Sequence, residues 1–201
     1  MTRDRPIIKG CAALLIIDVQ NGTCGPKEAE TRPEFYKATA LRVIPNIAAL
    51  LAAFRTAGLE VIYTVIENLT KDGRDRSLDY KISGISVAKG SWDAQVCDAI
   101  TPGEDEIVLR KNSSNAFIST NIDYLLRSMG KRQVILCGVI TDQCVESAVR
   151  DACDLGYLVT LVPDACATYT VERQEASVRA IKGYCRQLTT DALEAELSET
   201  S

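Results

Sequence analysis

The sequence predicts a three-layer α/β/α sandwich with a mainly parallel central sheet. Three observations lead to this fold class. Continuous apolar runs of strand length recur along the chain, stretches with a helical spacing of apolar residues lie between them, and several of those stretches stop at a glycine. Strands that are apolar on both faces are typical of a parallel sheet covered by helices on its two sides. Helical crossovers between such strands complete the three layers.

The expected strands are apolar throughout, as strands buried on both faces are. In chain order they occupy residues 12–18, 59–66, 105–111, 133–140 and 157–165, and we expect a short last strand at 186–190. The expected helices lie at 38–57, 115–129, 144–155 and 171–184. Gly58, Gly130 and Gly156 follow the first three of these helices. A glycine in this position ends a helix because it adopts the left-handed conformation without a steric penalty.

Residues 68–103 follow neither spacing. Charged residues, glycines and Trp92 are mixed along this segment, which predicts a long excursion between the second and third strands. Long loops in compact α/β domains often cover a site, and a plain solvated loop is the alternative. Because no linker, repeat or low-complexity tract divides the sequence, we expect one domain that spans residues 1–201.

The composition is that of a soluble globular protein. Of 201 residues, 46% are hydrophobic and 25% are charged, and the formal net charge is -4. No positive field is therefore expected to gather a nucleic acid or an anionic membrane surface. The sequence has no stretch of about 18 apolar residues, and charges stand near the N-terminus where a signal peptide needs its apolar region. We expect a cytoplasmic protein with no nucleic-acid partner and no membrane partner.

Cysteine and histidine restrict the chemistry further. The eight cysteines form no CxxC pair in a chain too large to need disulfides, so most are expected to be reduced thiols. The chain has no histidine, which excludes Ser-His-Asp triads, Cys-His pairs and nearly every common catalytic zinc site. We expect neither a metal nor another cofactor, and a cysteine nucleophile would need a base other than histidine.

Three reactive side chains follow three of the expected strands. Asp18 ends the first strand, Lys111 ends the third, and Cys144 comes shortly after the fourth. The carboxyl ends of parallel strands meet at one edge of a sheet, where the ligands of open α/β sheets bind. We therefore expect a carboxylate, an ammonium and a thiol to lie together. Each alone has a common structural explanation, as a turn residue, a solvated cation or a buried thiol.

The expected position of Cys144 favours a reactive sulfur. Thr141 or Asp142 is expected to cap the helix that follows, which places the cysteine in or beside the first helical turn. Unpaired N–H groups and the helix dipole favour an anion there. Such thiols have a lowered pKa, and the thiolate is the nucleophile. Without histidine, a buried Asp18 is the expected proton acceptor, and Lys111 is expected to stabilise the thiolate.

Nearly the whole chain resembles, in order and spacing, the isochorismatase-like cysteine hydrolase superfamily. The matching segments are LLIIDVQNG around Asp18, KNSSNAF from Lys111, and CGVITDQCVESAVRDACDLGY around Cys144. The resemblance implies a Rossmann-like sandwich in which Cys144 attacks a carbonyl carbon, Asp18 receives its proton and Lys111 stabilises the charges. It also implies a non-proline cis peptide between Val139 and Ile140. This bond would aim the N–H groups of Ile140 and Cys144 at the developing oxyanion.

Two departures from the family pattern narrow the expected reaction. Nicotinamidases of the family hold a metal with an Asp and His cluster, which a chain without histidine cannot build. Members that cleave the enol ether of isochorismate lack the cysteine nucleophile, whereas this chain has Cys144. The resemblance therefore implies a metal-independent cysteine amidohydrolase for a small carboxamide, carbamoyl or ureido compound, with a thioester-type intermediate and release of ammonia or an amine. An enol-ether hydrolase and a non-catalytic binding or scaffold subunit are the alternatives.

Further residues near the expected edge are candidates for substrate contacts. They are Gln20, Glu67, Asn68, Arg74, Trp92, Asn115 and Phe117. Arg74, with Arg76 and Lys81 in the same excursion, is a candidate for binding a substrate carboxylate, and a solvated charged loop is the alternative. Trp92 either lines the pocket or packs against the protein. Relatives in the family commonly form dimers or tetramers, so the resemblance also implies a homo-oligomer.

Overall fold

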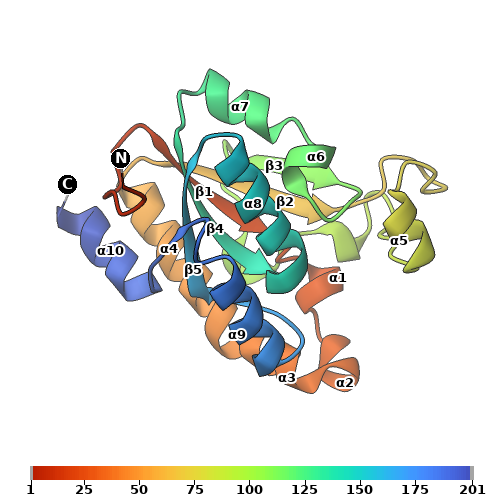
Figure 1. Cartoon of the computed structure of the whole chain (residues 1–201). Helices are drawn as coiled ribbons and strands as arrows, with labels where there is room; N and C mark the ends of the chain where they lie inside the picture. Colours follow the sequence, from red (N-terminus) through yellow and green to blue (C-terminus); the bar gives the residue numbers. More distant parts are fainter. Residues whose placement is uncertain (1, 200–201) are drawn as a thin grey trace.

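Six parallel strands form the centre of the molecule. The computed structural model describes residues 2–199, and its sheet is built from β1 (Ala12–Ile17), β2 (Glu60–Ile66), β3 (Ile107–Lys111), β4 (Gln133–Val139), β5 (Leu158–Ala167) and β6 (Arg186–Gln187). The strand order is β3-β2-β1-β4-β5-β6, and every neighbouring pair is parallel. Helices cover both faces of the sheet (Figure 1). The prediction of a three-layer α/β/α sandwich is therefore confirmed.

The two central strands explain why continuous apolar runs predict this sheet. Every residue of β1 and β4 is buried, because each strand has a neighbour on both sides and helices above and below. The five longer strands lie within one or two residues of their predicted positions. The last strand is shorter than predicted and gives way to α10 (Thr190–Glu199), a helix that we did not predict. The N–H of Thr190 donates to the carboxylate of Asp164 at 3.0 Å, which fixes this start.

One long helix dominates the first face. The chain is helical from Pro33 to Thr56, through α3 (Pro33–Ala38), a π-helical turn (Thr39–Val43) and α4 (Ile44–Thr56). The helix begins earlier than predicted because Pro33 occupies the first helical position, where a missing N–H loses no hydrogen bond. Pro45 cannot donate to the carbonyl four residues before it, and the wider π turn makes room for its ring. α10 packs beside α4 on this face.

By length and composition alone, this helix is long and apolar enough to cross a membrane. It passes that test although Arg42 and Arg55 interrupt its apolar sequence. One side of the helix faces the protein, where Ile47, Leu50 and Phe54 are all 0% exposed, whereas Leu41 is 71% exposed. A helix that packs one apolar face onto a sheet in this way is typical of the core of a globular fold.

The second face carries four helices. They are α6 (Ala116–Ser119), α7 (Ile122–Ser128), α8 (Glu146–Asp154) and α9 (Val171–Ala180). The helix predicted at 115–129 is two shorter helices, because the Thr120 hydroxyl donates to the Ala116 carbonyl and accepts from the Ile122 N–H. These bonds end α6 and start α7. Gly130 and Gly156 follow their helices with φ of 68° and 93°, as predicted for left-handed stops.

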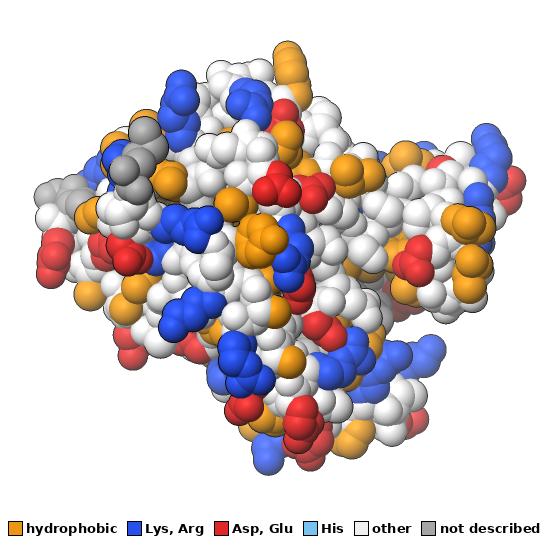
Figure 2. All heavy atoms as spheres, viewed as in Figure 1, with side chains coloured by type: hydrophobic (Ala, Val, Ile, Leu, Met, Phe, Trp, Pro, Cys, Tyr) orange, Lys and Arg blue, Asp and Glu red, His pale blue; other side chains and the backbone are white. Residues whose placement is uncertain are grey.

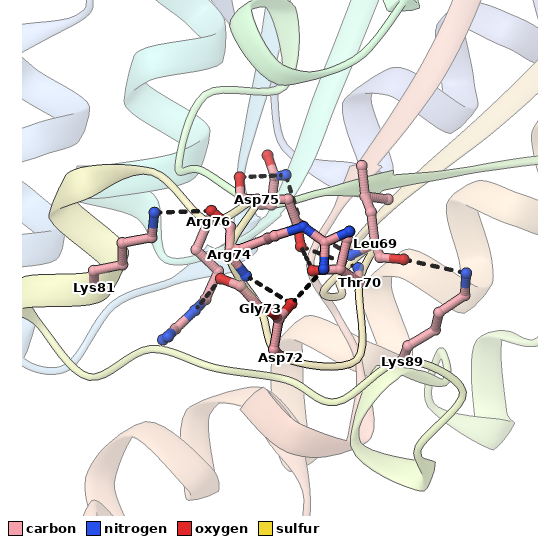
Figure 3. A network of polar contacts seen from close by, with 10 residues as sticks. Leu69, Thr70, Asp72, Gly73, Arg74, Asp75, Arg76, Lys81 and Lys89 are labelled. Atoms are coloured by element: carbon pink, nitrogen blue, oxygen red, sulfur yellow. Dashed lines mark hydrogen bonds and ion pairs between the residues drawn. The ribbon is translucent and has the colours of Figure 1, made fainter.

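The excursion after β2 is a folded segment held by its own hydrogen bonds. The carboxylate of Asp75 accepts from the N–H groups of Leu69 and Thr70 and from the side chain of Asn112 (Figure 3). Lys89 donates to the Leu69 carbonyl, which ties a later part of the excursion to its beginning. The excursion also contains α5 (Leu78–Ile82) and 3-10 turns at Trp92–Ala94 and Asp98–Ile100. A plain solvated loop is therefore the wrong description of this segment.

The surface carries charges of both signs. On the face shown in Figure 2, Lys and Arg side chains are interspersed with Asp and Glu side chains. Several are paired within a helix, as Arg127 is with Asp123 and Arg150 with Glu146. Across the described part of this face, no large area of one sign stands out that would attract a polyanion.

Candidate active site

Asp18, Lys111 and Cys144 meet at the carboxyl edge of the sheet. Asp18 follows β1 directly, Lys111 is the last residue of β3, and Cys144 lies in the π-helical turn Thr141–Val145 after β4. Lys111 Nζ lies 2.7 Å from Asp18 Oδ2 and 3.5 Å from Cys144 Sγ. The three residues are only 1%, 0% and 4% exposed. The structure thus brings together the carboxylate, the ammonium and the thiol in one buried cluster, which we call the chamber.

The neighbouring strand β2 holds Asp18 in place. Its φ of 56° lies in the left-handed region, which costs a residue with a side chain about 1 to 2 kcal/mol. The Asp18 N–H donates to the Thr64 carbonyl at 3.1 Å, and the Thr64 hydroxyl donates to Asp18 Oδ1 at 2.8 Å. One carboxylate oxygen faces Thr64 and the other faces Lys111. Sequence reasoning missed Thr64, although a hydroxyl inside the apolar run EVIYTVI is a usable signal.

Lys111 is a fully buried ammonium surrounded by acceptors. Its Nζ donates to the Ser113 carbonyl at 2.9 Å and to the Tyr80 phenol oxygen at 3.5 Å. Burial lowers the pKa of Lys111, but the Asp18 carboxylate, and the Cys144 sulfur when it is ionised, raise it by more. The pKa therefore lies above its usual value, and the group stays charged. Sequence reasoning missed Tyr80, because it comes from the excursion and no local pattern distinguishes it.

The Cys144 thiol is protonated at rest. Burial raises its pKa to about 12, the ammonium of Lys111 lowers the pKa, and the carboxylate of Asp18 raises it through its charge and a hydrogen bond. The prediction of a lowered pKa is therefore wrong, because desolvation of a thiolate in the closed chamber outweighs the helical turn and the nearby cation. A thiol that is hydrogen-bonded to a carboxylate can lose its proton during attack on a substrate.

The predicted cap of this helical turn is also wrong. The N-cap residue is Ile140, and no side chain bonds to the first turn from that position. The carboxylate of Asp142 accepts instead from the Thr168 hydroxyl at 2.5 Å and from Arg173 Nε at 2.6 Å. These bonds tie the turn to the end of β5 and the start of α9. The Thr141 hydroxyl is buried and has no partner among the described residues.

A non-proline cis peptide joins Val139 to Ile140, as the family resemblance implies. Gly138 precedes it with φ of 122°, and a Cβ atom built there would lie 2.2 Å from the Ile17 carbonyl oxygen. Only glycine fits this close approach of β4 to β1. Ile140 is the residue directly before the turn that carries Cys144, so its N–H group belongs to the same edge of the sheet.

Three of the predicted substrate contacts have structural partners instead. The side-chain amide of Gln20 bonds to main-chain groups at the end of β2 and in the excursion, at 2.6 to 2.9 Å. Glu67 pairs with Arg110 at 2.7 Å. Asn68 donates to the Ser86 hydroxyl at 3.1 Å. These polar groups fix the excursion onto the sheet, so the prediction that they bind substrate is not supported by their contacts.

The cations of the excursion are used within the excursion. Arg74 pairs with Asp72 at 3.0 Å, and 73% of the Arg74 side chain is exposed (Figure 3). Lys81 donates to the Arg74 carbonyl at 2.8 Å, and Arg76 donates to carbonyls of the same segment. The hypothesis that these three side chains hold a substrate carboxylate is therefore unsupported. For Arg74 the solvated alternative describes the structure.

Trp92, Asn115 and Phe117 also have structural tasks. Trp92 is 56% exposed, and its ring packs against Gly25 at the end of α1 (Asn21–Cys24), with 3.2 Å between Cη2 and a Cβ atom built on that glycine. Asn115 caps α6, because its Oδ1 accepts from the Phe117 N–H at 2.8 Å. The ring of Phe117 is buried, 6.0 Å from that of Tyr157. Packing and capping therefore account for all three.

A broad apolar groove on the surface does not contain the sulfur. It has a volume of about 630 Å³, lies between the start of the long helix and α9, and is lined mainly by apolar side chains. Tyr169 lines it, and Arg32 and Arg173 stack on the Tyr169 ring at 4.4 and 5.1 Å. Burial raises the pKa of the Tyr169 phenol.

The donor set around the site offers no obvious metal cage. Among residues 2–199, no group of three or more His, Cys, Asp or Glu side chains is arranged to hold a metal ion. All eight cysteines are free thiols. The chemistry considered below uses the described side chains alone.

Comparison with known proteins gives a consistent result. The family model described as the isochorismatase domain matches residues 12–192. Ureidoacrylate amidohydrolase RutB from Klebsiella pneumoniae subsp. pneumoniae is 29% identical over 211 residues, covering 90% of this chain and 88% of the relative. A cysteine hydrolase from Pseudomonas syringae pv. phaseolicola 1448A has a TM-score of 0.88 at 25% identity, covering 98% of this chain and 97% of its own.

A further solved relative carries a substrate in its name. N-carbamoylsarcosine amidase from Thermoplasma acidophilum has a TM-score of 0.71 at 26% identity, covering 90% of this chain and 96% of its own. The likeness to these two structures covers 98% and 90% of this chain. Because the family model spans most of the sequence, the chain belongs to the isochorismatase family.

Proposed function

We propose that the chain is a metal-independent cysteine amidohydrolase that cleaves a C–N bond of a small ureido, carbamoyl or carboxamide compound. One observation carries the proposal. In a closed chamber without histidine, the ammonium of Lys111 lies 2.7 Å from the Asp18 carboxylate and 3.5 Å from the Cys144 sulfur. A buried ion pair is poor evidence for stability alone, so its position beside a thiol favours a catalytic task.

The first half of the reaction begins with the thiol. Asp18 takes the proton from Cys144 as the sulfur attacks the carbonyl carbon, which avoids a free thiolate in a chamber that disfavours it. The ammonium of Lys111 stays charged and stabilises the developing negative charge. The N–H groups of Ile140 and Cys144 are the proposed oxyanion donors, and one such donor lowers the barrier by about 3 kcal/mol.

The second half of the reaction returns the enzyme to its resting state. The C–N bond breaks as Asp18 gives its proton to the departing nitrogen, so that ammonia or an amine leaves and a thioester on Cys144 remains. Asp18 then accepts a proton from water as the water attacks the thioester carbonyl. The C–S bond breaks, the sulfur regains a proton, and the acid product leaves.

The relatives support the substrate class. Ureidoacrylate amidohydrolase RutB and N-carbamoylsarcosine amidase are named for a ureido and a carbamoyl compound. At 29% and 26% identity, the shared feature that we transfer is the C–N bond and not the rest of the molecule. If the substrate is a ureido compound, the acid product released in the second half of the reaction is a carbamate, which decays to carbon dioxide and to the amine or ammonia that did not leave in the first half.

Ammonia release from a panel of small amides and ureas tests the proposal. Cys144→Ala should lower turnover by several orders of magnitude, because the loss of a nucleophile commonly has this effect. Cys153→Ala is the matched control, since Cys153 is a partly exposed thiol on α8. If Cys144→Ala kept more than about one per cent of the activity, nucleophilic catalysis by this sulfur would be excluded.

Asp18→Asn is the second informative variant. It keeps the size of the side chain but removes the proton acceptor, so its activity should approach that of Cys144→Ala. The Cys144 sulfur has no catalytic role if the chain is an enol-ether hydrolase or a scaffold subunit. Full activity of both variants toward an enol ether, or no turnover of any panel compound by the wild type, would favour those alternatives.

We also propose that the chain is a single domain that forms a cytoplasmic homo-oligomer, a dimer or a tetramer. Exposed apolar side chains support assembly, since Leu41 and Val171 on the groove are 71% and 67% exposed. Eight free thiols are typical of a reducing compartment. Light scattering after gel filtration should give a multiple of 21.9 kDa, and Leu41→Glu should weaken the assembly. A wild-type monomer at micromolar concentration would contradict the oligomer.

A further inference from the structure

Two thiols outside the proposed catalytic cluster lie in contact with each other. Cys24 is the last residue of α1, and Cys97 lies near the end of the excursion. The Cys24 thiol donates a hydrogen bond to the Cys97 sulfur. Both are free thiols, with exposures of 5% and 8%. The fold therefore brings together two oxidisable groups that are far apart in the sequence.

Main-chain hydrogen bonds hold the two cysteines in place. The Cys97 N–H donates to the Val19 carbonyl at 3.2 Å, and the Asn21 N–H donates to the Gln95 carbonyl at 2.9 Å. These bonds belong to a short antiparallel bridge between the chain after β1 and the excursion. Cys24 ends the short helix that follows this bridge. The backbone thus keeps the two sulfurs together without a covalent bond.

The two thiols differ in reactivity. The hydrogen bond from Cys24 lowers the pKa of Cys97, and this effect outweighs burial, which acts in the opposite direction. The same bond raises the pKa of Cys24, and burial adds to that effect. Because the thiolate is the nucleophile, Cys97 is the attacking sulfur, and Cys24 stays protonated beside it. A thiol of lowered pKa next to a second thiol is typical of redox-sensitive cysteines.

We propose that Cys24 and Cys97 are an oxidisable pair that forms a disulfide with a peroxide as the oxidant, and that this pair reacts before the Cys144 sulfur. The Cys97 thiolate attacks one oxygen of hydrogen peroxide and the O–O bond breaks. Cys97 becomes a sulfenic acid, and the hydroxide that leaves takes up the proton that Cys97 lost. The Cys24 sulfur then attacks the Cys97 sulfur, the S–O bond breaks, and water leaves with the proton of Cys24. The two thiols lose two electrons in total, and the peroxide is reduced to two molecules of water.

The disulfide closes a long loop of the chain. The loop contains the long helix, β2 and most of the excursion. A crosslink over such a loop stabilises the folded state, mainly because it restricts the unfolded chain. The oxidised protein should therefore melt about 10 °C above the reduced protein. A small dithiol should reverse the change by two exchange steps.

A second pair of cysteines lacks these features. Cys137 and Cys166 lie on the neighbouring strands β4 and β5, and both are 0% exposed. The Cys137 thiol donates to the Leu15 carbonyl at 4.0 Å and not to Cys166. Burial raises the pKa of both thiols. We therefore expect them to stay reduced in the folded protein, which makes them internal controls.

Peptide mapping of the wild-type protein tests the proposal. The protein is treated briefly with hydrogen peroxide near neutral pH, its remaining thiols are alkylated in urea, and it is digested without reduction. The expected product is a disulfide-linked pair of peptides that carry Cys24 and Cys97, which dithiothreitol separates. Cys137 and Cys166 should be fully alkylated. Cys144 should be oxidised at least about tenfold more slowly than the pair, because burial raises its pKa to about 12.

Three outcomes of the mapping would overturn the proposal. The first is oxidation of Cys144 before the pair. The second is a disulfide that joins Cys97 to a cysteine other than Cys24, and the third is the absence of any linked peptide. None of these readouts depends on turnover, so the result holds for this pair whether or not the chain is an amidohydrolase.

Single variants separate the two steps. Cys24→Ser keeps a donor to Cys97 but removes the second sulfur, so Cys97 should stop at the sulfenic acid, which dimedone captures. In Cys97→Ser, peroxide should leave the Tm unchanged. Cys153→Ser is the matched control and should behave as the wild type, since Cys153 is a partly buried thiol on α8. No captured sulfenic acid in Cys24→Ser, or a Tm that rises with peroxide in Cys97→Ser, would also overturn the proposal.

Discussion

Neutralising Lys111 should destabilise the protein strongly. The Asp18–Lys111 pair has a separation of 2.7 Å, and both side chains are shielded from water, with exposures of 1% and 0%. In Lys111→Met, the Asp18 carboxylate keeps its hydrogen bond from Thr64 but loses its cation. Removing one partner of a buried pair commonly costs about 3 to 5 kcal/mol, because it leaves an uncompensated charge in the interior.

The size of the effect makes it measurable by melting. For a chain of this length, each kcal/mol lowers the Tm by about 2 to 4 °C, so Lys111→Met should melt roughly 6 to 20 °C below the wild type. Asp18→Asn should show a loss of similar order, since it leaves the ammonium unpaired. The double variant should lose no more than either single variant, because it removes both charges.

Urea unfolding at pH 7 of the wild type, the two single variants and the double variant gives the coupling free energy between Asp18 and Lys111 directly. The expected value is about 3 kcal/mol or more, comparable to one single loss. Arg74→Met is the control, since the Arg74–Asp72 pair lies on the surface and its removal should leave the unfolding midpoint unchanged. Losses of Asp18→Asn and Lys111→Met that add up within about 0.5 kcal/mol would refute the reasoning.

Three further outcomes follow from the same contacts. Gly138→Ala should destabilise the fold by more than about 4 kcal/mol, or prevent folding, because the added Cβ meets the backbone of β1 at 2.2 Å; a wild-type melting curve would contradict this. Thr64→Val should cost about 1.5 to 3 kcal/mol by removing a hydrogen bond to the buried Asp18 carboxylate, and an unchanged unfolding free energy would oppose it. Burial raises the pKa of the Cys144 and Cys166 thiols from 9.0 to about 12, so the folded state binds more protons than the unfolded state between these values. The unfolding free energy should therefore be highest below pH 9 and fall as the pH rises, and denaturant titrations that show constant or rising stability from pH 9 to 11 would count against these buried thiols.

The strands and the meeting of three reactive groups were predictable because they depend on local patterns and one topological rule. β1 and β4 are apolar on both faces, so their sequences alone predict central parallel strands. Parallel strands send their carboxyl ends to one edge. Asp18, Lys111 and Cys144 each stand at such an end, and their convergence needs no knowledge of side-chain contacts.

The rest of the site depends on tertiary structure. Tyr80 is distant from Lys111 in sequence and reaches it only through the folded excursion. The direction of the Cys144 pKa shift depends on the depth of burial, which outweighs the helical turn that the sequence makes visible. A polar residue near a predicted site is equally suited to bind a main chain, and the side chains of Gln20 and Asn115 do so here.

The central claim is that the Cys144 sulfur attacks the carbon of the scissile C–N bond. The most direct measurement is rapid acid quenching of the wild-type enzyme during turnover of a panel compound, followed by mass mapping of the peptides. The account predicts an acyl or carbamoyl adduct on Cys144 that decays as product accumulates and that is more abundant when deacylation is slowed. Turnover with the adduct on another residue, or ammonia release by Cys144→Ala at the wild-type rate, would contradict it.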